Sequence, residues 1–426
     1  MGNISLNSPK TAPPRVLLVG YGGGHIRMLL PLALRMRAEG WAEPFVMALT
    51  TAAPVAKAAG FEPMGFADLI DPSNAADLAA VALGAELASD LAAPPVDPRE
   101  THAYLGLSYQ NLVCEHGKAH AKARYASHGR QCFHPVQALK RAIERWQTDL
   151  VIATNSPRAE RAAIDAAGQL GVKSLCLVDL FALDEVAWIG KPGYADEVAV
   201  LSEGVKRFLV EAGRNQTQVH VTGNPSFDTL HEPHWRAQGQ AYRAQLLGGD
   251  AEKKLLLFAT SAEPSAHPFK PGAVGNVRIP WQISAELGTW LRSNPGWQAV
   301  VKAHPSHAQL LGDAVEGLQV LPADWPLPAV LHAADAVLII TSTVAVEATL
   351  LGKPVLRVWG SLFDDATPFE ALGFAKASCN LGEVGAGLSA MLVSPVAGSV
   401  QGHKQGHETS NATERVCALI QRMLAE

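Results

Sequence analysis

The sequence lacks any segment that would cross a membrane. It contains no run of about 18 apolar residues, the length that a helix needs to span the hydrocarbon core of a bilayer. The stretch from Met1 to Lys10 has no apolar core of the kind found in secretory signal peptides. Both absences favour a cytoplasmic protein whose association with a membrane is at most peripheral.

Cysteine is also scarce, and its pattern is not that of a disulfide-bonded or zinc-binding domain. The five cysteines are scattered, and no Cys-x-x-Cys pair occurs, which favours a reducing compartment. Cys114, His116, His120 and Cys132 could be imagined as zinc ligands, with the two histidines on one helix face. Their wide and irregular spacing makes this a weak zinc candidate.

Positive charge is not in excess, and no long basic block occurs. The chain has 35 basic and 40 acidic residues and a formal net charge of −5. Nucleic acid is bound largely through clustered lysine and arginine, so nucleic-acid binding as the main role is disfavoured. An anionic substrate would have to be held by local dipoles and a few cations rather than by a basic surface.

What the sequence does contain is a repeating alternation of strand and helix. An apolar strand at 15–20, a helix from 26, a strand at 45–49, a helix at 52–59 and a short strand at 61–65 predict the start of a doubly wound sheet. The same alternation returns in the second half of the chain. The sequence therefore predicts an α/β protein with two Rossmann-like domains.

The 426 residues are too many for a single core and suit two domains. We place the first domain at 1–228, because a turn-rich hinge ends it. An Ala-rich insertion at 67–130 interrupts that domain and is expected to be helical. The second domain is placed at 229–407, and a final amphipathic helix at 408–426.

The segment 336–358 has the pattern of a buried strand, a hydroxyl cluster, a helix and a second buried strand. The hydroxyl cluster consists of Thr341, Ser342 and Thr343. A helix that begins directly after a parallel strand presents unpaired N–H groups that can hold a phosphate. Glu347 lies about one turn inside, where a carboxylate could meet a ribose hydroxyl. On spacing alone, Ser342 or Thr343 could instead be only an N-cap, and Glu347 a solvated helix residue.

A glycine-rich turn, Tyr21–His25, follows the first strand. Glycine allows positive φ and the close approach of a substrate, so these glycines are candidate substrate-binding residues. The three glycines are Gly22, Gly23 and Gly24. The turn is not the GxGxxG of NAD-binding proteins, so NAD is disfavoured. His25 begins the helix, where the dipole predicts a lowered pKa and a neutral imidazole able to act as a general base; it could equally be a simple cap.

Further polar residues follow other predicted strands. Asp179 ends a strand of the first domain and could be an acid or a base, while Arg158 opens a helix there and could hold an anion or be solvated. In the second domain, Lys302 and His304 end a strand and could donate to a phosphate; the alternative is a structural loop, with His307 as a bystander. The first strand of that domain is followed by Thr260, Ser261 and Glu263, which are candidate donor-binding residues because the groups after this strand would face the same crevice as Ser342.

Several of these motifs resemble those of nucleotide-sugar enzymes. Gly20–Leu34 is similar to the glycine-rich loop of lipid II-forming N-acetylglucosaminyltransferases, and His220–Leu230 resembles the hinge of UDP-N-acetylglucosamine 2-epimerases and related capsule enzymes. Thr341–Val355 resembles the donor-binding signature that these families share. Val301–His307 resembles a segment of capsule and teichoic-acid polymer transferases, and His407–Val416 the closing helix of GT-B enzymes.

The resemblance implies a GT-B fold, in which two Rossmann-like domains face a cleft and the C-terminal helix crosses back to the first domain. It implies that Ser342, Thr343 and the helix N-terminus hold the donor diphosphate. Glu347 would then contact the ribose, and His304 would lie near the phosphates. It further implies a nucleotide sugar as substrate, no other cofactor and no obligatory metal.

These motifs lead to one preferred function and two alternatives. We expect a glycosyltransferase that moves a sugar from a nucleotide-sugar donor to a hydroxyl of a saccharide or glycoconjugate acceptor, in surface polysaccharide or glycoconjugate synthesis. His25, or else Asp179, would be the base, and the turn with Gly22, Gly23 and Gly24 would bind the acceptor. The first alternative is a nucleotide-sugar 2-epimerase or hydrolase, which the departures of the Tyr21–His25 and Thr260–Pro264 segments from the epimerase pattern disfavour. The second is a non-catalytic nucleotide-sugar-binding partner. A homodimer is one assembly that the chain could adopt.

Overall fold

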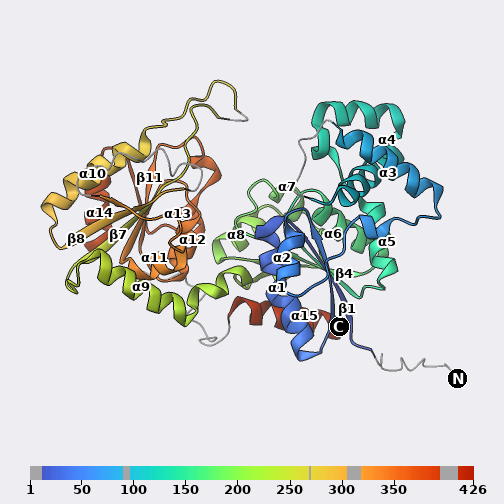
Figure 1. Cartoon of the computed structure of the whole chain (residues 1–426), viewed down its shortest axis with the longest axis horizontal. Helices are drawn as coiled ribbons and strands as arrows, with labels where there is room; N and C mark the ends of the chain where they lie inside the picture. The colour runs from blue at the N-terminus through green and yellow to red at the C-terminus, as the bar shows by residue number, and fades with distance from the viewer. Residues whose placement is uncertain (1–11, 90–95, 268–269, 305–317, 394–410) are drawn as a thin grey trace. The chain divides into compact units, whose positions relative to one another are not determined.

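The chain forms two compact units, each built around a parallel six-stranded sheet (Figure 1). The computed structural model describes residues 12–89, 96–267, 270–304, 318–393 and 411–426. Unit 1 comprises residues 1–201, 205–226 and 410–426, and unit 2 comprises residues 202–204 and 227–409. The predicted α/β class with two Rossmann-like domains is confirmed.

The sheet of unit 1 has the strand order β2-β1-β3-β4-β5-β6, with every neighbouring pair parallel. Its strands are β1 (Arg15–Tyr21), β2 (Glu43–Leu49), β3 (Leu150–Thr154), β4 (Lys173–Leu177), β5 (Glu197–Val200) and β6 (Val219–Val221). All five residues of β3 are buried, as expected for a central strand covered on both faces. The strand predicted at 61–65 is wrong, because this segment makes only one bridge, from Met64 to Met47.

Helices cover both faces of this sheet, and the C-terminal helix is one of them. The helices are α1 (Gly22–Glu39), α2 (Ala52–Ala58), α5 (Val136–Arg145), α6 (Ala159–Leu170), α7 (Val186–Ile189), α8 (Glu203–Glu211) and α15 (Ala412–Ala425). In α15, Val416 and Ile420 join the same core as Ile26 of α1. Asn411 and Glu414 form a capping box that fixes the start of α15. The C-terminal helix thus packs on the first sheet, as predicted.

The segment expected to be a helical insertion forms a tightly packed helical hairpin. A Cβ atom on Gly84 would lie 1.8 Å from the carbonyl oxygen of His102, and one on Gly106 would lie 1.8 Å from that of Ala80. Only glycine therefore allows the two backbones to approach this closely. The hairpin consists of α3 (Ala75–Ala88) and α4 (Pro98–His128).

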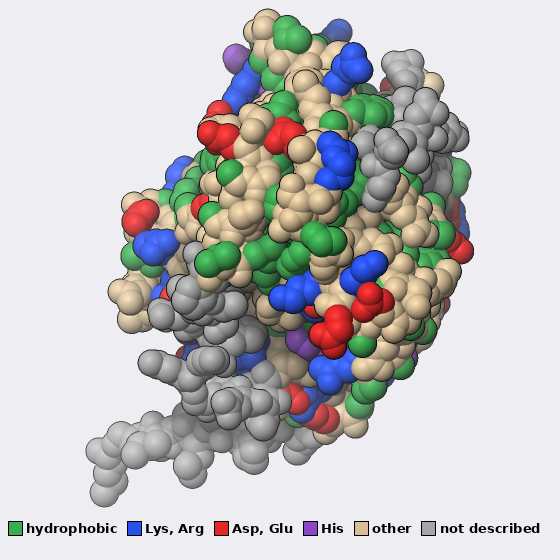
Figure 2. Space-filling model, turned by 90° about the vertical axis from the view of Figure 1, so that its left-hand side faces the viewer, with side chains coloured by type: hydrophobic (Ala, Val, Ile, Leu, Met, Phe, Trp, Pro, Cys, Tyr) green, Lys and Arg blue, Asp and Glu red, His purple; other side chains and the backbone are tan. Residues whose placement is uncertain are grey.

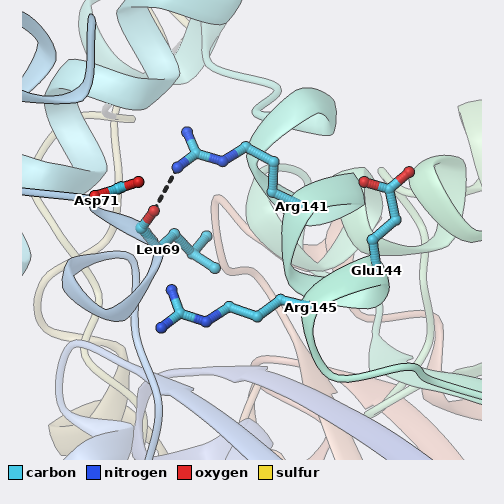
Figure 3. Close-up of a pocket in the computed structure, with 5 residues that line it drawn as sticks. All are labelled: Leu69, Asp71, Arg141, Glu144 and Arg145. Carbon is cyan, nitrogen blue, oxygen red and sulfur yellow. Dashed lines mark hydrogen bonds between the residues drawn. The ribbon is translucent and has the colours of Figure 1, made fainter. Parts of the chain in front are cut away.

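Arginines of α5 attach the insertion to the rest of unit 1. Arg141 pairs with the buried Asp77 at the start of α3, with an Nη2–Oδ2 distance of 2.6 Å, and also donates to the carbonyl of Leu69 (Figure 3). Arg145 donates to the carbonyl of Asp68. Together these bonds hold the segment before α3 against α5, beside a surface pocket of about 410 Å³. Because the guanidinium groups already have partners, we assign this pocket a structural role.

The sheet of unit 2 has the order β12-β11-β10-β7-β8-β9, again with every pair parallel. Its strands are β7 (Lys254–Ala259), β8 (Trp297–Lys302), β9 (Gln319–Val320), β10 (Ala336–Ile339), β11 (Val355–Trp359) and β12 (Ala377–Asn380). Its helices are α9 (Pro233–Leu246), α10 (Ile279–Ser293), α11 (Leu327–Ala333), α12 (Val344–Leu350), α13 (Phe369–Leu372) and α14 (Val384–Val393). The predicted strand, hydroxyl cluster and helix at 336–350 are present.

Basic and acidic side chains are interspersed on the face shown in Figure 2, and its coloured side chains form no continuous basic surface. None of the described helices combines the length and apolar character needed to cross a bilayer. Across the same described ranges, no three histidine, cysteine, aspartate or glutamate side chains are arranged to bind a metal ion.

Candidate functional site

Three titratable side chains meet at the carboxyl edge of the unit 1 sheet. His25 is in the first turn of α1, Glu160 is in the first turn of α6, and Asp179 follows β4. The Nδ1 atom of His25 lies 3.0 Å from Oε1 of Glu160, and its Nε2 atom lies 3.3 Å from Oδ2 of Asp179. Because β1, β3 and β4 are adjacent and parallel, the segments that follow them reach the same edge. We call these three residues the triad.

Glu160 is the buried anchor of the triad. Its side chain is fully buried, and Oε1 accepts hydrogen bonds from the Tyr21 amide at 2.8 Å and from the hydroxyl of Thr154. The Thr154 hydroxyl also lies 2.7 Å from Nδ1 of His25. Such contacts fix the orientation of the imidazole ring.

Asp179 is the more accessible carboxylate, with 30% of its side chain exposed against 0% for Glu160. Its own amide donates to the side chain of Asn155 at 2.9 Å, and Oδ1 accepts from the Leu180 amide at 2.6 Å. The backbone therefore orients Asp179, while Oδ2 faces His25. A substrate can reach Asp179 more easily than Glu160.

The triad changes the protonation of His25. Burial is the largest single influence and lowers its pKa, but hydrogen bonds to Asp179 and Glu160, with the charges of both carboxylates, outweigh it and raise the pKa to about 10. Burial likewise raises the pKa of Asp179, but bonds to His25 and the imidazolium charge hold it below its ordinary value. The expected neutral imidazole is therefore wrong: at neutral pH His25 is a cation between two carboxylates.

The predicted glycines form the first turn of α1 beside His25. Gly22 has φ of 81°, which favours glycine, and the Gly23 amide donates to the hydroxyl of Thr51 at 3.2 Å. A Cβ atom on Gly24 would meet nothing within 4 Å, so this glycine faces open space. The acceptor-binding role of the glycines stays a prediction.

In unit 2, four of the predicted donor-binding residues line one pocket of about 430 Å³. These residues are Thr260, Lys302, His304 and Ser342. The remaining wall is largely aliphatic and includes Ala259, Ala303, Val320, Leu321, Ala323, Leu327 and Val344. A mostly apolar pocket with a few polar groups is typical of sites for small organic ligands. The neighbouring segment with His307 lies outside the described residues.

Lys302 and Thr260 are already bonded to the backbone. The Nζ atom of Lys302 donates to the carbonyls of Pro322, Ala323 and Trp325 at 2.8, 2.9 and 2.9 Å, and burial lowers its pKa. The hydroxyl of Thr260 accepts from the His304 amide at 3.0 Å. We infer that Lys302 shapes the wall of the pocket, whereas the predicted contact with a phosphate would require it to leave these bonds.

Ser261 and Glu263 also act on neighbouring loops. The hydroxyl of Ser261 accepts from the Thr341 amide at 3.2 Å. Glu263 is buried, and its two oxygens accept from the Ser361 hydroxyl at 2.6 Å and the Leu362 amide at 2.8 Å. In this geometry Glu263 positions the segment after β11, so we do not retain it as a direct donor ligand.

The start of α12 offers fewer unpaired N–H groups than expected. The Val344 amide donates to the hydroxyl of Ser342 at 3.4 Å, and the Ala345 and Val346 amides donate to the carbonyls of Ser342 and Thr343. The helix is also short, with seven residues. The expectation of several unpaired amides is therefore wrong for Val344, Ala345 and Val346. The hydroxyls of Ser342 and Thr343 are then the better candidates for the predicted contact with a diphosphate.

Glu347 is the acid of α12 that lies partly buried without a partner. Across the described part of the chain, no hydrogen bond or ion pair to its carboxyl group is seen, and burial raises its pKa to about 7. Its oxygens are still reached by solvent, since neither is among the fully buried polar atoms that lack a partner. A half-buried carboxyl group of this kind is suited to accept hydrogen bonds from a ligand's hydroxyl groups.

No family model and no curated protein matches the sequence. Solved structures do match over nearly the whole chain. A putative UDP-N-acetylglucosamine 2-epimerase from Listeria monocytogenes has a TM-score of 0.55 at 16% identity, covering 97% of both chains. The UDP-GlcNAc 2-epimerase from Neisseria meningitidis, solved with UDP-GlcNAc, has a TM-score of 0.54 at 14% identity, covering 96% of this chain and 99% of that one. The chain has the GT-B fold.

The glycotransferase of kitacinnamycin gives a similar match, with a TM-score of 0.53 at 15% identity, covering 96% of this chain and 99% of that chain. Epimerases and a transferase thus match about equally well. At such identities the likeness establishes the fold, and the reaction has to be argued from the residues of the site.

The sequence reasoning missed Glu160. The sequence did offer a signal for it. Glu160 is an acid two residues after Arg158, in the first turn of a helix that follows a predicted strand. Its link to His25 joins residues 135 positions apart. Only the adjacency of β1 and β3 brings the two side chains together.

Proposed function

We propose that this chain is a cytoplasmic glycosyltransferase that moves a sugar from a nucleotide-sugar donor to an acceptor hydroxyl, in the synthesis of a surface polysaccharide or glycoconjugate. The observation that carries the proposal is the triad, an imidazolium held between two carboxylates at the carboxyl edge of the unit 1 sheet. In open α/β sheets ligands bind at this edge. Asp179, with 30% of its side chain exposed, is the carboxylate of the triad that an acceptor can reach.

The protonation of the triad favours Asp179, rather than His25, as the group that takes the acceptor's proton. His25 already carries a proton at neutral pH and acts as the cation that positions Asp179. The acceptor oxygen attacks the anomeric carbon as its proton moves to Asp179. The bond from that carbon to the diphosphate breaks, and its electron pair leaves with the nucleoside diphosphate. Glu160 stays in contact with Nδ1 of His25 and holds the ring in place.

The pocket of unit 2 would hold the nucleotide. Its aliphatic wall suits a base, and the hydroxyl of Ser342, which lines the pocket, suits the diphosphate. The exposed Thr343 follows it in the chain and offers a second hydroxyl beside the pocket lining. Glu347, whose carboxyl group lacks a partner among the described residues, suits the ribose hydroxyls. This assignment is supported by the Neisseria meningitidis relative in fold, which was solved with UDP-GlcNAc. The proposed reaction uses no metal and no other cofactor.

A second candidate is a nucleotide-sugar 2-epimerase. The epimerases from Listeria monocytogenes and Neisseria meningitidis match the fold at least as well as the transferase does. The triad would suit this chemistry too, because epimerisation at carbon 2 removes a proton from that carbon and returns one on the opposite face. Asp179 is the accessible carboxylate of the triad for such a transfer.

Incubation of the full chain with nucleotide sugars in D₂O separates the two candidates. UDP-, GDP-, CMP- and dTDP-sugars are first screened for a thermal shift, and the best donor is then followed by proton NMR. A transferase leaves the donor intact until an acceptor glycan is added. An epimer with deuterium at carbon 2, formed without acceptor, would establish the epimerase instead. Binding without turnover in every mixture would contradict both and indicate a binding partner.

A further inference from the structure

Arg158, at the start of α6, is a cation without an anionic partner. Among the described residues its side chain has no hydrogen bond or ion pair, and its Nε atom is buried without a partner. The guanidinium carbon of Arg158 lies over the Tyr21 ring, 4.9 Å from its centroid. Partly buried arginines usually bind a carboxylate, a phosphate or a carbonyl, so this vacancy calls for a partner.

The position of Arg158 connects it with the triad. It lies two residues before Glu160 on the same helix turn. The amide of Tyr21, over whose ring the guanidinium lies, donates to Glu160, which in turn contacts His25. A ligand held by Arg158 is therefore held at the carboxyl edge of the sheet, next to the proton-transfer group.

A second unsatisfied polar group, the hydroxyl of Tyr104, is near enough for the positive charge of Arg158 to act on its pKa. The hydroxyl of Tyr104, from helix α4 of the insertion, is buried without a hydrogen-bond partner. Its ring packs edge-on against Phe66 and Phe133 at 5.1 and 6.0 Å between centroids, so the hydroxyl cannot easily turn away. Burial raises the pKa of Tyr104 to about 12, with the positive charge of Arg158 acting in the opposite direction. The hydroxyl thus remains a hydrogen-bond donor at neutral pH.

We propose that Arg158, assisted by the hydroxyl of Tyr104, binds an anionic group of the acceptor, so that the acceptor is an acidic or phosphorylated sugar. This rests on the proposed function, since it names the acceptor class of the same site. A planar guanidinium suits a carboxylate and a phosphate alike. The insertion then has a role in specificity, because it supplies Tyr104, and Arg158 is a specificity residue rather than a catalytic one.

Binding of simple sugars to the full chain tests this without turnover. Glucuronic acid and glucose 6-phosphate serve as the carboxylate and phosphate probes, and glucose is the neutral control, each followed by isothermal titration. We expect one or both anionic sugars to bind and glucose not to. Loss of a charge-assisted pair predicts that R158Q weakens this binding by about tenfold or more. Arg158→Lys, which keeps the charge, should restore part of it, and Tyr104→Phe should weaken it by a smaller factor.

The matched control is R161Q, one turn further along α6, where Arg161 stacks on Trp188 and lies 3.8 Å from Asp165. This variant should bind the anionic sugars as the wild type does.

Three results would each overturn the proposal. They are equal binding of the anionic sugars by R158Q and the wild type, equal loss of binding in R158Q and R161Q, and no preference of the wild type for the anionic sugars over glucose. The thermal shift with the nucleotide donor should persist in R158Q, which also shows that the variant is folded. A failed transfer assay alongside a positive anion test would reject the proposed function and leave the anion site standing.

Discussion

At the carboxyl edge of the unit 1 sheet the polar side chains are charged and paired with one another, whereas in unit 2 they are mostly bonded to the backbone. His25, Glu160 and Asp179 contact each other through ionisable atoms. Lys302 and Ser261 instead bind carbonyl and amide groups of adjoining loops. The two units share a parallel six-stranded sheet but differ in their polar groups. The triad of unit 1 is suited to moving a proton, and the pocket of unit 2 is suited to holding a ligand.

Asp179→Asn should give the largest effect. It keeps the shape of the triad but removes the group proposed to accept the proton, so we expect product formation to fall by about 10²–10⁴-fold. UDP affinity should not change, because the nucleotide pocket is in unit 2. The control is Asp184→Asn, which alters an exposed acid five residues away. Comparable activity of the two variants would show that Asp179 is not the proton acceptor.

Gly106→Ala should weaken the insertion, which unit 2 does not have. The new methyl group would meet the Ala80 carbonyl at 1.8 Å, and such overpacking destabilises by about 1–3 kcal/mol. Gly168→Ala in α6 is the matched control, since nothing lies within 4 Å of that methyl position and alanine favours the helix by up to about 1 kcal/mol. Thermal unfolding should separate the variants, with a lower Tm for Gly106→Ala only. Identical Tm values would contradict the close packing of α3 on α4.

Glu347→Gln should weaken nucleotide binding by about tenfold, the value of one or two hydrogen bonds to a charged group. The carboxyl pKa of about 7 gives this site a pH dependence. Below that pH the group is protonated and accepts ribose hydroxyls poorly, so UDP affinity should rise as the pH increases through 7. The variant should lose this dependence, and Glu252→Gln, an exposed change in unit 2, should keep it. Titration calorimetry at several pH values measures both, and a pH-independent wild type would contradict the role of Glu347.

The fold was largely predictable because its signals are local. The apolar run of β10 and the amphipathic pattern of α15 each indicate their structure without reference to the rest of the chain. The strand predicted at 61–65 does not form. This short segment makes a single bridge, from Met64 to Met47, and a short apolar pattern alone does not show whether a strand partner is available.

The site was less predictable because its properties depend on distant neighbours. The local helix start predicts a neutral His25, but two carboxylates from other elements reverse that prediction. Lys302 has the residue type of a phosphate ligand, yet carbonyls some 20 residues further along the chain occupy its donors. A sequence shows which residues follow a strand and not which partners tertiary packing gives them.

The charge state of His25 is the most direct test of this account. An NMR titration of ¹³C-labelled histidine in the full chain, with the His25 signal assigned by its loss in His25→Gln, measures the pKa without any substrate. Because the two carboxylates stabilise the charged form, His25 should remain an imidazolium through neutral pH and lose its proton only near pH 10. A midpoint at or below the ordinary value of 6.5 would show that the carboxylates do not hold the proton there. The assignment of Asp179 as the proton acceptor would then be wrong.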